Sequence, residues 1–183
     1  LNVAIARENI VIPLARSFLI GVLREIEGII SDRDADVDAA REKQIEGEFF
    51  YRIVEGFISQ DNPSGNNRIK AQLTGDMANV IANEVVSEIS RGIIGQVNRI
   101  RDQLESSFGD DKNQAVLAAE RLSLYVGIFL PDLELRLGSL QRVRMENALQ
   151  DVKESSETGD ESKALAAQAT IIEIISAYEN ELI

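Results

Sequence analysis

Apolar side chains recur at intervals of three and four residues along almost the whole chain. Phe18, Val22, Ile26 and Ile29 follow this spacing near the amino terminus, whereas alternation of apolar and polar residues is rare. Intervals of three and four place side chains on one face of an α-helix, while alternation would place them on one face of a strand. The pattern predicts an all-α protein in which each helix buries an apolar face in an antiparallel helical bundle.

Short polar segments rich in Gly, Asp, Ser or Pro interrupt these periods and predict the ends of the helices. They indicate about six long helices and one short helix near residues 68–73. The segments are SDRDADVD, SQDNPSGNN, LTGDM, SSFGDDKN, LPD and SSETGDES. Pro13, Pro63 and Pro131 are expected at helix ends or in first turns, because proline lacks the N–H group that a helix interior requires.

The long helices pair into hairpins that repeat in sequence. RSFLIGVLREIEGII aligns with RGIIGQVNRIRDQLE, which matches Arg16 with Arg91, and after the next loop the alignment shifts by one position. A fainter third copy is indicated by SSETGDESKALAAQ, which is similar to SSFGDDKNQAVLAAE. One hairpin cannot bury its apolar face alone, so the hairpins must pack together. The prediction is a single helical-bundle domain over residues 1–183 with two clear hairpins and one degenerate hairpin, at 8–60, 77–130 and 133–182.

The segment EGEFFYRIVEGFISQDNPSGNNRI combines three aromatic residues with a polar ending. Phe49, Ile53 and Phe57 lie four residues apart and share one face of the predicted helix. We expect this face to be part of the core, where each such side chain contributes about 1.5–3 kcal/mol. The polar ending is then the loop between the first and second hairpins.

The composition narrows the chemistry that the chain can perform. There are 31 Asp and Glu against 19 Lys and Arg, which gives a formal net charge of −12 and disfavours nucleic acid and anionic lipid as partners. Cys and His are absent, which excludes disulfides, thiolate metal sites, imidazole catalysis and the usual zinc and haem ligands. Apolar runs are too short for a membrane span, so no membrane insertion is expected. Because the remaining side chains show no catalytic spacing, we expect no enzyme.

Oxygen ligands remain available for a hard cation. In the shifted alignment after the loop, Glu46 corresponds to Glu120 and Tyr51 to Tyr125, and Glu55 lies nearby on the same helix as Tyr51. Carboxylates and phenols from facing helices could bind iron, calcium or manganese. The alternative is that these residues lie at the boundary of the bundle, with exposed glutamates and hydrogen-bonded tyrosine hydroxyls.

The acidic loop SDRDADVDAAREK also offers alternating aspartates. An EF-hand loop beginning at Asp32 would require Gly at position 37 and Glu at position 43, and the chain has Val37 and Lys43 there. The alternative is a helix start in which Asp36 or Asp38 is the N-cap.

The segments AAREKQIEGEFFYRIVEGFISQDNPSGNNRI and AYENEL, together with the doubled hairpin, resemble helical extracytoplasmic domains of the imelysin type. The resemblance implies a helical bundle associated with bacterial iron permeases or periplasmic iron-uptake lipoproteins. That family carries a His-x-x-Glu motif thought to bind metal, whereas this chain contains no His.

Two functions are therefore expected from the sequence. The first is a non-catalytic, exported protein of imelysin-like type, associated with iron uptake or with a membrane permease or complex that performs it. The second is a structural or extrinsic subunit that binds a larger assembly through a helix face and has no ligand of its own. The chain begins at Leu1 and not at Met, so we interpret it as trimmed, by a signal peptidase or otherwise. A periplasmic or lumenal location is expected.

Overall fold

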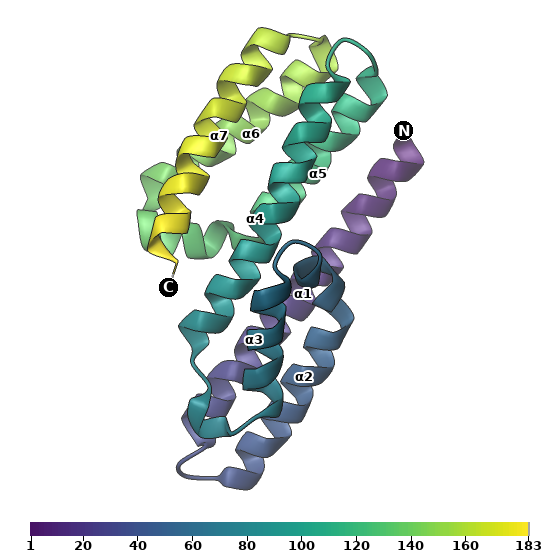
Figure 1. The fold of residues 1–183 in the computed structure, drawn as a ribbon. Helices are drawn as coiled ribbons and strands as arrows, with labels where there is room; N and C mark the ends of the chain where they lie inside the picture. The colour runs from purple at the N-terminus through teal and green to yellow at the C-terminus, as the bar shows by residue number, and fades with distance from the viewer. Residues whose placement is uncertain (183) are drawn as a thin grey trace. The chain divides into compact units, whose positions relative to one another are not determined.

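The computed structural model describes residues 1–182 and is 89% helical, with seven α-helices and no strand among these residues (Figure 1). The all-α prediction is confirmed, as are six long helices and a shorter one. The elements in chain order are α1 (Asn2–Asp32), α2 (Val37–Ser59), α3 (Pro63–Thr74), the 3-10 helix η1 (Met77–Asn79), α4 (Ala82–Ser107), α5 (Lys112–Leu137), α6 (Ser139–Thr158) and α7 (Glu161–Glu181).

Short polar side chains fix the starts of several helices. The Asp36 carboxylate accepts a hydrogen bond from the Ala39 N–H at the start of α2, which confirms the predicted N-cap. Asn62, Asp111 and Asp160 cap α3, α5 and α7 in the same way. Each cap satisfies a backbone N–H group that the first turn of a helix leaves without a partner. The aspartates in these loops thus set the helix boundaries.

Proline positions depart from the sequence-based expectation at two of three sites. Pro63 begins α3 as predicted, but Pro13 lies inside α1 and Pro131 inside α5. The prediction that LPD ends a helix is wrong, because α5 continues to Leu137 and the turn occurs at Gly138, whose φ is 86°. Phe129 and Leu133 on either side of Pro131 are buried, and this packing offsets the lost hydrogen bond. The third hairpin therefore begins at α6.

The chain divides into two compact units that share its long helices. Unit 2 comprises residues 13–93, and unit 1 comprises residues 1–12 together with residues 94–182. Helices α1 and α4 each contribute one part to each unit. The sequence predicted one domain, and this prediction is neither confirmed nor contradicted by the division into two compact units.

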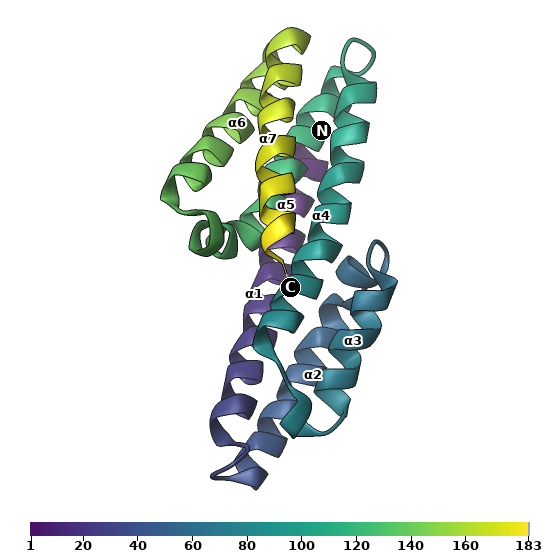
Figure 2. The same ribbon diagram turned by 60° about the vertical axis from the view of Figure 1, so that its left-hand side comes forward.

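Unit 2 consists of parts of α1 and α4 together with α2, α3 and η1, which lie between α1 and α4 in the sequence. Helices α2 and α3 lie side by side (Figures 1 and 2). The Arg33 guanidinium donates hydrogen bonds to the carbonyls of Met77, Ala78 and Val80 and so anchors η1. The core is lined by Val22, Ile26, Ile29, Tyr51, Val54, Ile58, Ile69, Leu73, Val85 and Ile89.

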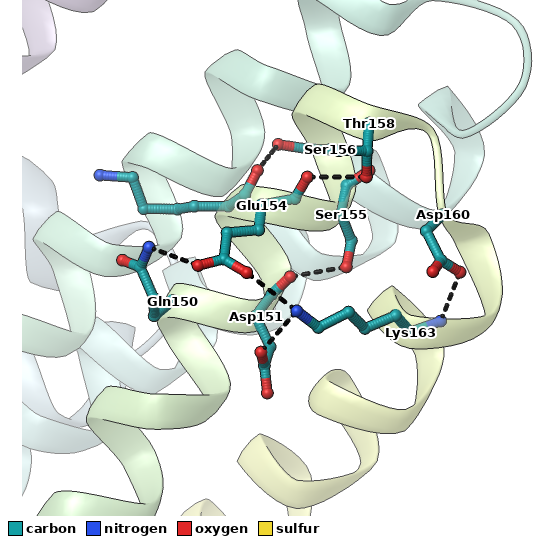
Figure 3. A network of polar contacts seen from close by, with 9 residues as sticks. Gln150, Asp151, Glu154, Ser155, Ser156, Thr158, Asp160 and Lys163 are labelled. Carbon is teal, nitrogen blue, oxygen red and sulfur yellow. Dashed lines mark hydrogen bonds and ion pairs between the residues drawn. The ribbon is translucent and has the colours of Figure 1, made fainter.

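Unit 1 packs α5, α6 and α7 with parts of α1 and α4. The rings of Phe129 and Tyr178 stack at 5.3 Å between centroids, and the Tyr178 hydroxyl donates to Asp132 Oδ2 at 2.6 Å. At the turn from α6 to α7, the Lys163 ammonium pairs with Asp151 at 2.8 Å and Glu154 at 2.9 Å (Figure 3). Hydrogen bonds from Lys163 to these carboxylates raise the pKa of its ammonium group. The network closes the α6–α7 hairpin from its solvent side.

The buried positions of α2 and α5 recur in the register that their N-caps set. Asp36 and Asp111 occupy equivalent positions in this register, and the last residues of α1 and α4 match in it as well. In this register Tyr51 corresponds to Val126, whereas the one-position shift inferred from the sequence matches it with Tyr125, which is buried as well. The matching buried pairs are Ala40 and Ala115, Gln44 and Ala119, Gly47 and Leu122, Tyr51 and Val126, Val54 and Phe129, and Ile58 and Leu133.

Candidate functional site

Helix α2 carries two apolar faces, and unit 2 buries one of them. The buried face includes Tyr51, Val54 and Ile58. On another side of the helix, Ile45 is 60% exposed, Phe49 61% and Ile53 45%. The prediction that Phe49 and Ile53 belong to the core is wrong, and Phe57 is half-buried.

Small residues explain which face is buried. A Cβ added at Gly47 would lie 3.1 Å from Leu73 Cδ2 and 3.2 Å from Glu25 Cβ, so α1 and α3 both approach α2 closely at this glycine. Ala40 lies two turns earlier on the same side and is fully buried. Close packing needs small side chains where helices meet, and the face of Phe49 and Ile53 offers none in the middle of the helix.

The exposed apolar residues belong to a longer surface that we call the outer face of α2. At about 100° per residue, its members fall on one side of the helix, and all are exposed. A Cβ added at Gly56 would meet nothing within 4 Å, so the fold itself leaves the space beside this glycine open. The outer face comprises Asp38, Glu42, Ile45, Glu46, Phe49, Ile53 and Gly56.

Aromatic rings connect the outer face to the interior. The ring of Phe49 meets that of Phe50 edge-on at 6.0 Å, and Phe50 meets Phe18 of α1 at 6.1 Å. Phe50 also packs over Gly21, where an added Cβ would lie 2.9 Å from its ring. These contacts pack the base of Phe49 against Phe50 and, through it, against α1.

A polar cleft of about 270 Å³ lies between α2 and α3. The Tyr51 hydroxyl donates to Asn66 Oδ1 at 2.8 Å, and Asn66 donates to Glu55 Oε1 at 3.1 Å. The Lys70 ammonium donates to the same Glu55 oxygen at 3.0 Å. The cleft is lined by Glu48, Tyr51, Arg52, Glu55, Lys70, Leu73 and Thr74.

The electrostatics of the cleft fix the protonation states of its groups. Hydrogen bonds from Lys70 and then Asn66 lower the pKa of Glu55, so this carboxylate is charged at neutral pH. Burial raises the pKa of Tyr51, so its hydroxyl keeps its proton and acts as a donor. The two groups tie α2 to α3 through Asn66, with the Tyr51 ring in the core and its hydroxyl hydrogen-bonded.

The residues predicted to bind a hard cation are distributed over both units. Tyr51 and Glu55 meet at the cleft, while Glu46 lies on the outer face of α2, 3.6 Å from the Lys43 ammonium. In unit 1, Tyr125 is buried on α5. Glu120 pairs there with Lys153 at 2.7 Å. Within residues 1–182, no three Asp or Glu side chains gather closely enough to hold a metal ion. The cation site stays a prediction.

Comparisons with protein-family models, curated proteins and solved structures found no match. The resemblance to imelysin-type domains and its link to iron uptake therefore stay predictions. Among residues 1–182, none of the helices combines the length and apolar character that crossing a bilayer requires.

The outer face is the feature that sequence reasoning misplaced. The sequence already indicated this face, because α2 carries apolar residues on two sides, whereas a surface helix of a globular protein needs only one apolar side. Periodicity identified the row Phe49, Ile53 and Phe57 and left the competing row at Tyr51, Val54 and Ile58 unused. A second apolar row on a helix is itself an indication of a binding surface.

Proposed function

We propose that this protein is a non-catalytic binding module that receives an apolar helix of a partner protein on the outer face of α2. The observation that carries the proposal is the exposed row of Ile45, Phe49 and Ile53, spaced four residues apart on a helix that is already packed on its other side. Exposed apolar residues that stand singly are common, whereas aligned ones mark interaction sites. Rows of this spacing are what one helix presents to another.

A helix fits this surface better than a membrane or a strand does. Asp38, Glu42 and Glu46 share the outer face, and together with the net charge of −12 they disfavour an anionic bilayer. The backbone groups of α2 bond within the helix, so no free edge is offered to a strand. Side chains of a second helix can instead pack between Ile45, Phe49 and Ile53, with exclusion of water from both apolar rows.

This function develops the expected role of a subunit that binds an assembly through a helix face. The imelysin-like alternative is compatible with it, because a membrane permease or membrane complex would then supply the partner helix. In both cases the protein acts by association and not by catalysis. The outer face of α2, and not the predicted cation ligands, is the surface that we assign to binding.

The test uses a synthetic amphipathic peptide with Leu at every third and fourth position as the partner helix, with binding followed by fluorescence anisotropy. The double substitution Phe49→Ser with Ile53→Ser should weaken binding at least about tenfold, because both anchors are lost. The matched control is Leu135→Ser, at an exposed leucine of α5 in unit 1, which should bind as the wild type does. Equal binding by the wild type and the double variant would overturn the proposal.

Two further measurements test whether a bilayer or a second copy of this chain, and not a partner helix, binds the outer face. Vesicles of phosphatidylcholine with phosphatidylserine test for a bilayer, and analytical ultracentrifugation tests for a second copy of this chain. We expect neither vesicle binding nor self-association that depends on Phe49 and Ile53. Either result, obtained without peptide binding, would assign the surface to that other occupant and contradict the proposal.

A further inference from the structure

The two ends of the outer face of α2 differ in charge and in shape. The amino-terminal end carries Asp38, Glu42 and Glu46, all exposed. The carboxyl-terminal end carries Ile53 and Gly56 and no charge. A helix lying along this surface would therefore meet carboxylates at one end. At the other end it would meet Ile53 and the open space beside Gly56.

We infer that the partner helix has Lys or Arg at one end of its apolar row, over Glu42 and Glu46, and that it approaches the α2 backbone at Gly56. This inference rests on the proposed function and specifies the chemistry and direction of its partner. Opposite charges at the rim of an apolar contact set register and orientation more than they set affinity. A glycine without a facing side chain permits a close approach of two helices.

One neighbouring cation, Lys43, is shared between the acidic end and a buried carboxylate. Lys43 lies 3.6 Å from Glu46, but it also lies 3.5 Å from Glu25, whose side chain is 7% exposed. Glu25 Oε2 has no hydrogen-bond partner, so Lys43 is the charge that compensates this buried carboxylate. Arg52, beside the apolar row, pairs with Glu48 at 2.6 Å. Basic side chains from a partner would supply the missing charge.

No contact within the fold requires a glycine at position 56. It lies inside α2, where glycine is less favourable than alanine because it gains no packing and loses more backbone freedom on folding. Gly47 on the same helix is explained by its contacts with Leu73 and Glu25. By contrast, an added Cβ at Gly56 meets nothing within 4 Å. Its place on the outer face, one turn after Ile53, is explained if a partner helix packs there.

The experiment compares two synthetic peptides with the same Leu row, one with Lys and one with Glu at the residues that flank one end. The full chain should bind the Lys peptide about tenfold more tightly than the Glu peptide at low ionic strength, and salt should reduce the difference. The double substitution Glu42→Lys with Glu46→Lys should reverse the preference. The control, Glu157→Lys with Glu179→Lys, changes the net charge equally at exposed positions of unit 1 and should retain it.

The approach at Gly56 is tested with Gly56→Leu. We expect an unchanged or higher melting temperature, because the helix gains a better helix former in open space. The same substitution should weaken both peptides at least about tenfold, because the added side chain separates the helices. Binding equal to the wild type would overturn the close approach at this residue.

The outcomes distinguish this inference from the function on which it rests. If both peptides bind the wild type equally and Phe49→Ser abolishes both, the charge inference is wrong and the binding function stands. If the charge preference disappears equally in the control pair, the preference comes from net charge and the inference is wrong. If Phe49→Ser weakens neither peptide, the proposed function is wrong as well.

Discussion

At the scale of single residues, Glu88 on α4 is a polar anchor of unit 2. Its carboxylate receives hydrogen bonds from Arg68, Arg91 and Asn62 at 2.8–3.0 Å, and its side chain is 7% exposed. A Cβ added at Gly65 would collide with Asn62 Nδ2 and Glu88 Oε2, so a larger residue of the PSG segment would displace both side chains. The SQDNPSGNN segment therefore begins a helix that is docked on a buried carboxylate.

We expect Glu88→Ala to lower the free energy of unfolding by about 3–5 kcal/mol, because it leaves arginine and amide donors around a buried position without their acceptor. The change is measured by urea denaturation. The control is Glu146→Ala, which removes the carboxylate of a surface pair with Arg142 and should cost less than about 1 kcal/mol. Similar losses for the two variants would contradict the anchoring role of Glu88.

Glu55 gives a prediction for the dependence of stability on pH. Its folded-state pKa lies below the ordinary value of 4.5, chiefly through the hydrogen bond from Lys70. Because the folded pKa is lowered, the stabilisation is complete above the unfolded-state pKa and is lost as the pH falls through the folded-state pKa. Lys70→Met should return the Glu55 pKa toward 4.5 in a carbon-detected NMR titration. An unchanged titration would show that Lys70 is not the cause.

At the scale of the helix, α2 was predicted correctly as a helix, but the side of it that is buried was predicted wrongly. The breaks on either side of it, an N-cap at Asp36 or Asp38 and its apolar character were predicted from the sequence, and Asp36 is the cap. The buried side was not predicted, because two apolar rows compete and the close packing at Gly47 selects the one that α1 and α3 can approach. The outer face, and with it the candidate binding site, follows from that selection.

The two rows of α2 should respond differently to truncation. Ile58→Ala should lower the free energy of unfolding by about 2–5 kcal/mol, because Ile58 is fully buried and its truncation leaves a cavity. Phe49→Ala should change it by less than about 0.5 kcal/mol, because its side chain is largely exposed. Urea denaturation of both variants is the measurement. A loss above about 2 kcal/mol for Phe49→Ala would place this residue in a packed core.

At the scale of the whole molecule, the predicted cation site meets competition from the fold. Glu46 lies beside Lys43, Glu120 pairs with Lys153, and Glu55 is held by Lys70 and Asn66. A cation would have to replace these partners. Among residues 1–182, no three carboxylates lie close enough together to bind it. Association through the outer face requires no such rearrangement.

We expect thermal unfolding to shift little with iron(III), calcium or manganese relative to chelator. A cation bound at a hundredfold excess over its dissociation constant would add about 2.7 kcal/mol to stability. The measurement is a melting series with each metal, repeated on the double variant Glu46→Gln with Glu120→Gln. A large metal-dependent rise that this variant abolishes would restore the ligand role of the two glutamates.

The sequence by itself determined the all-α class, most breaks between helices, a cap at Asp36 or Asp38 and the strongly acidic character, because these depend on local periodicity, capping and charge. Tertiary structure decided what local signals could not. Helix α5 continues beyond Pro131 because the residues around this proline are buried. The close approach of α1 and α3 at Gly47 determines which of the two apolar faces of α2 is buried. In the register set by the two N-caps, Tyr51 corresponds to Val126, and its match with Tyr125 stays a prediction. Sequence patterns show which faces a helix can bury, but contact with neighbouring helices determines which face is buried.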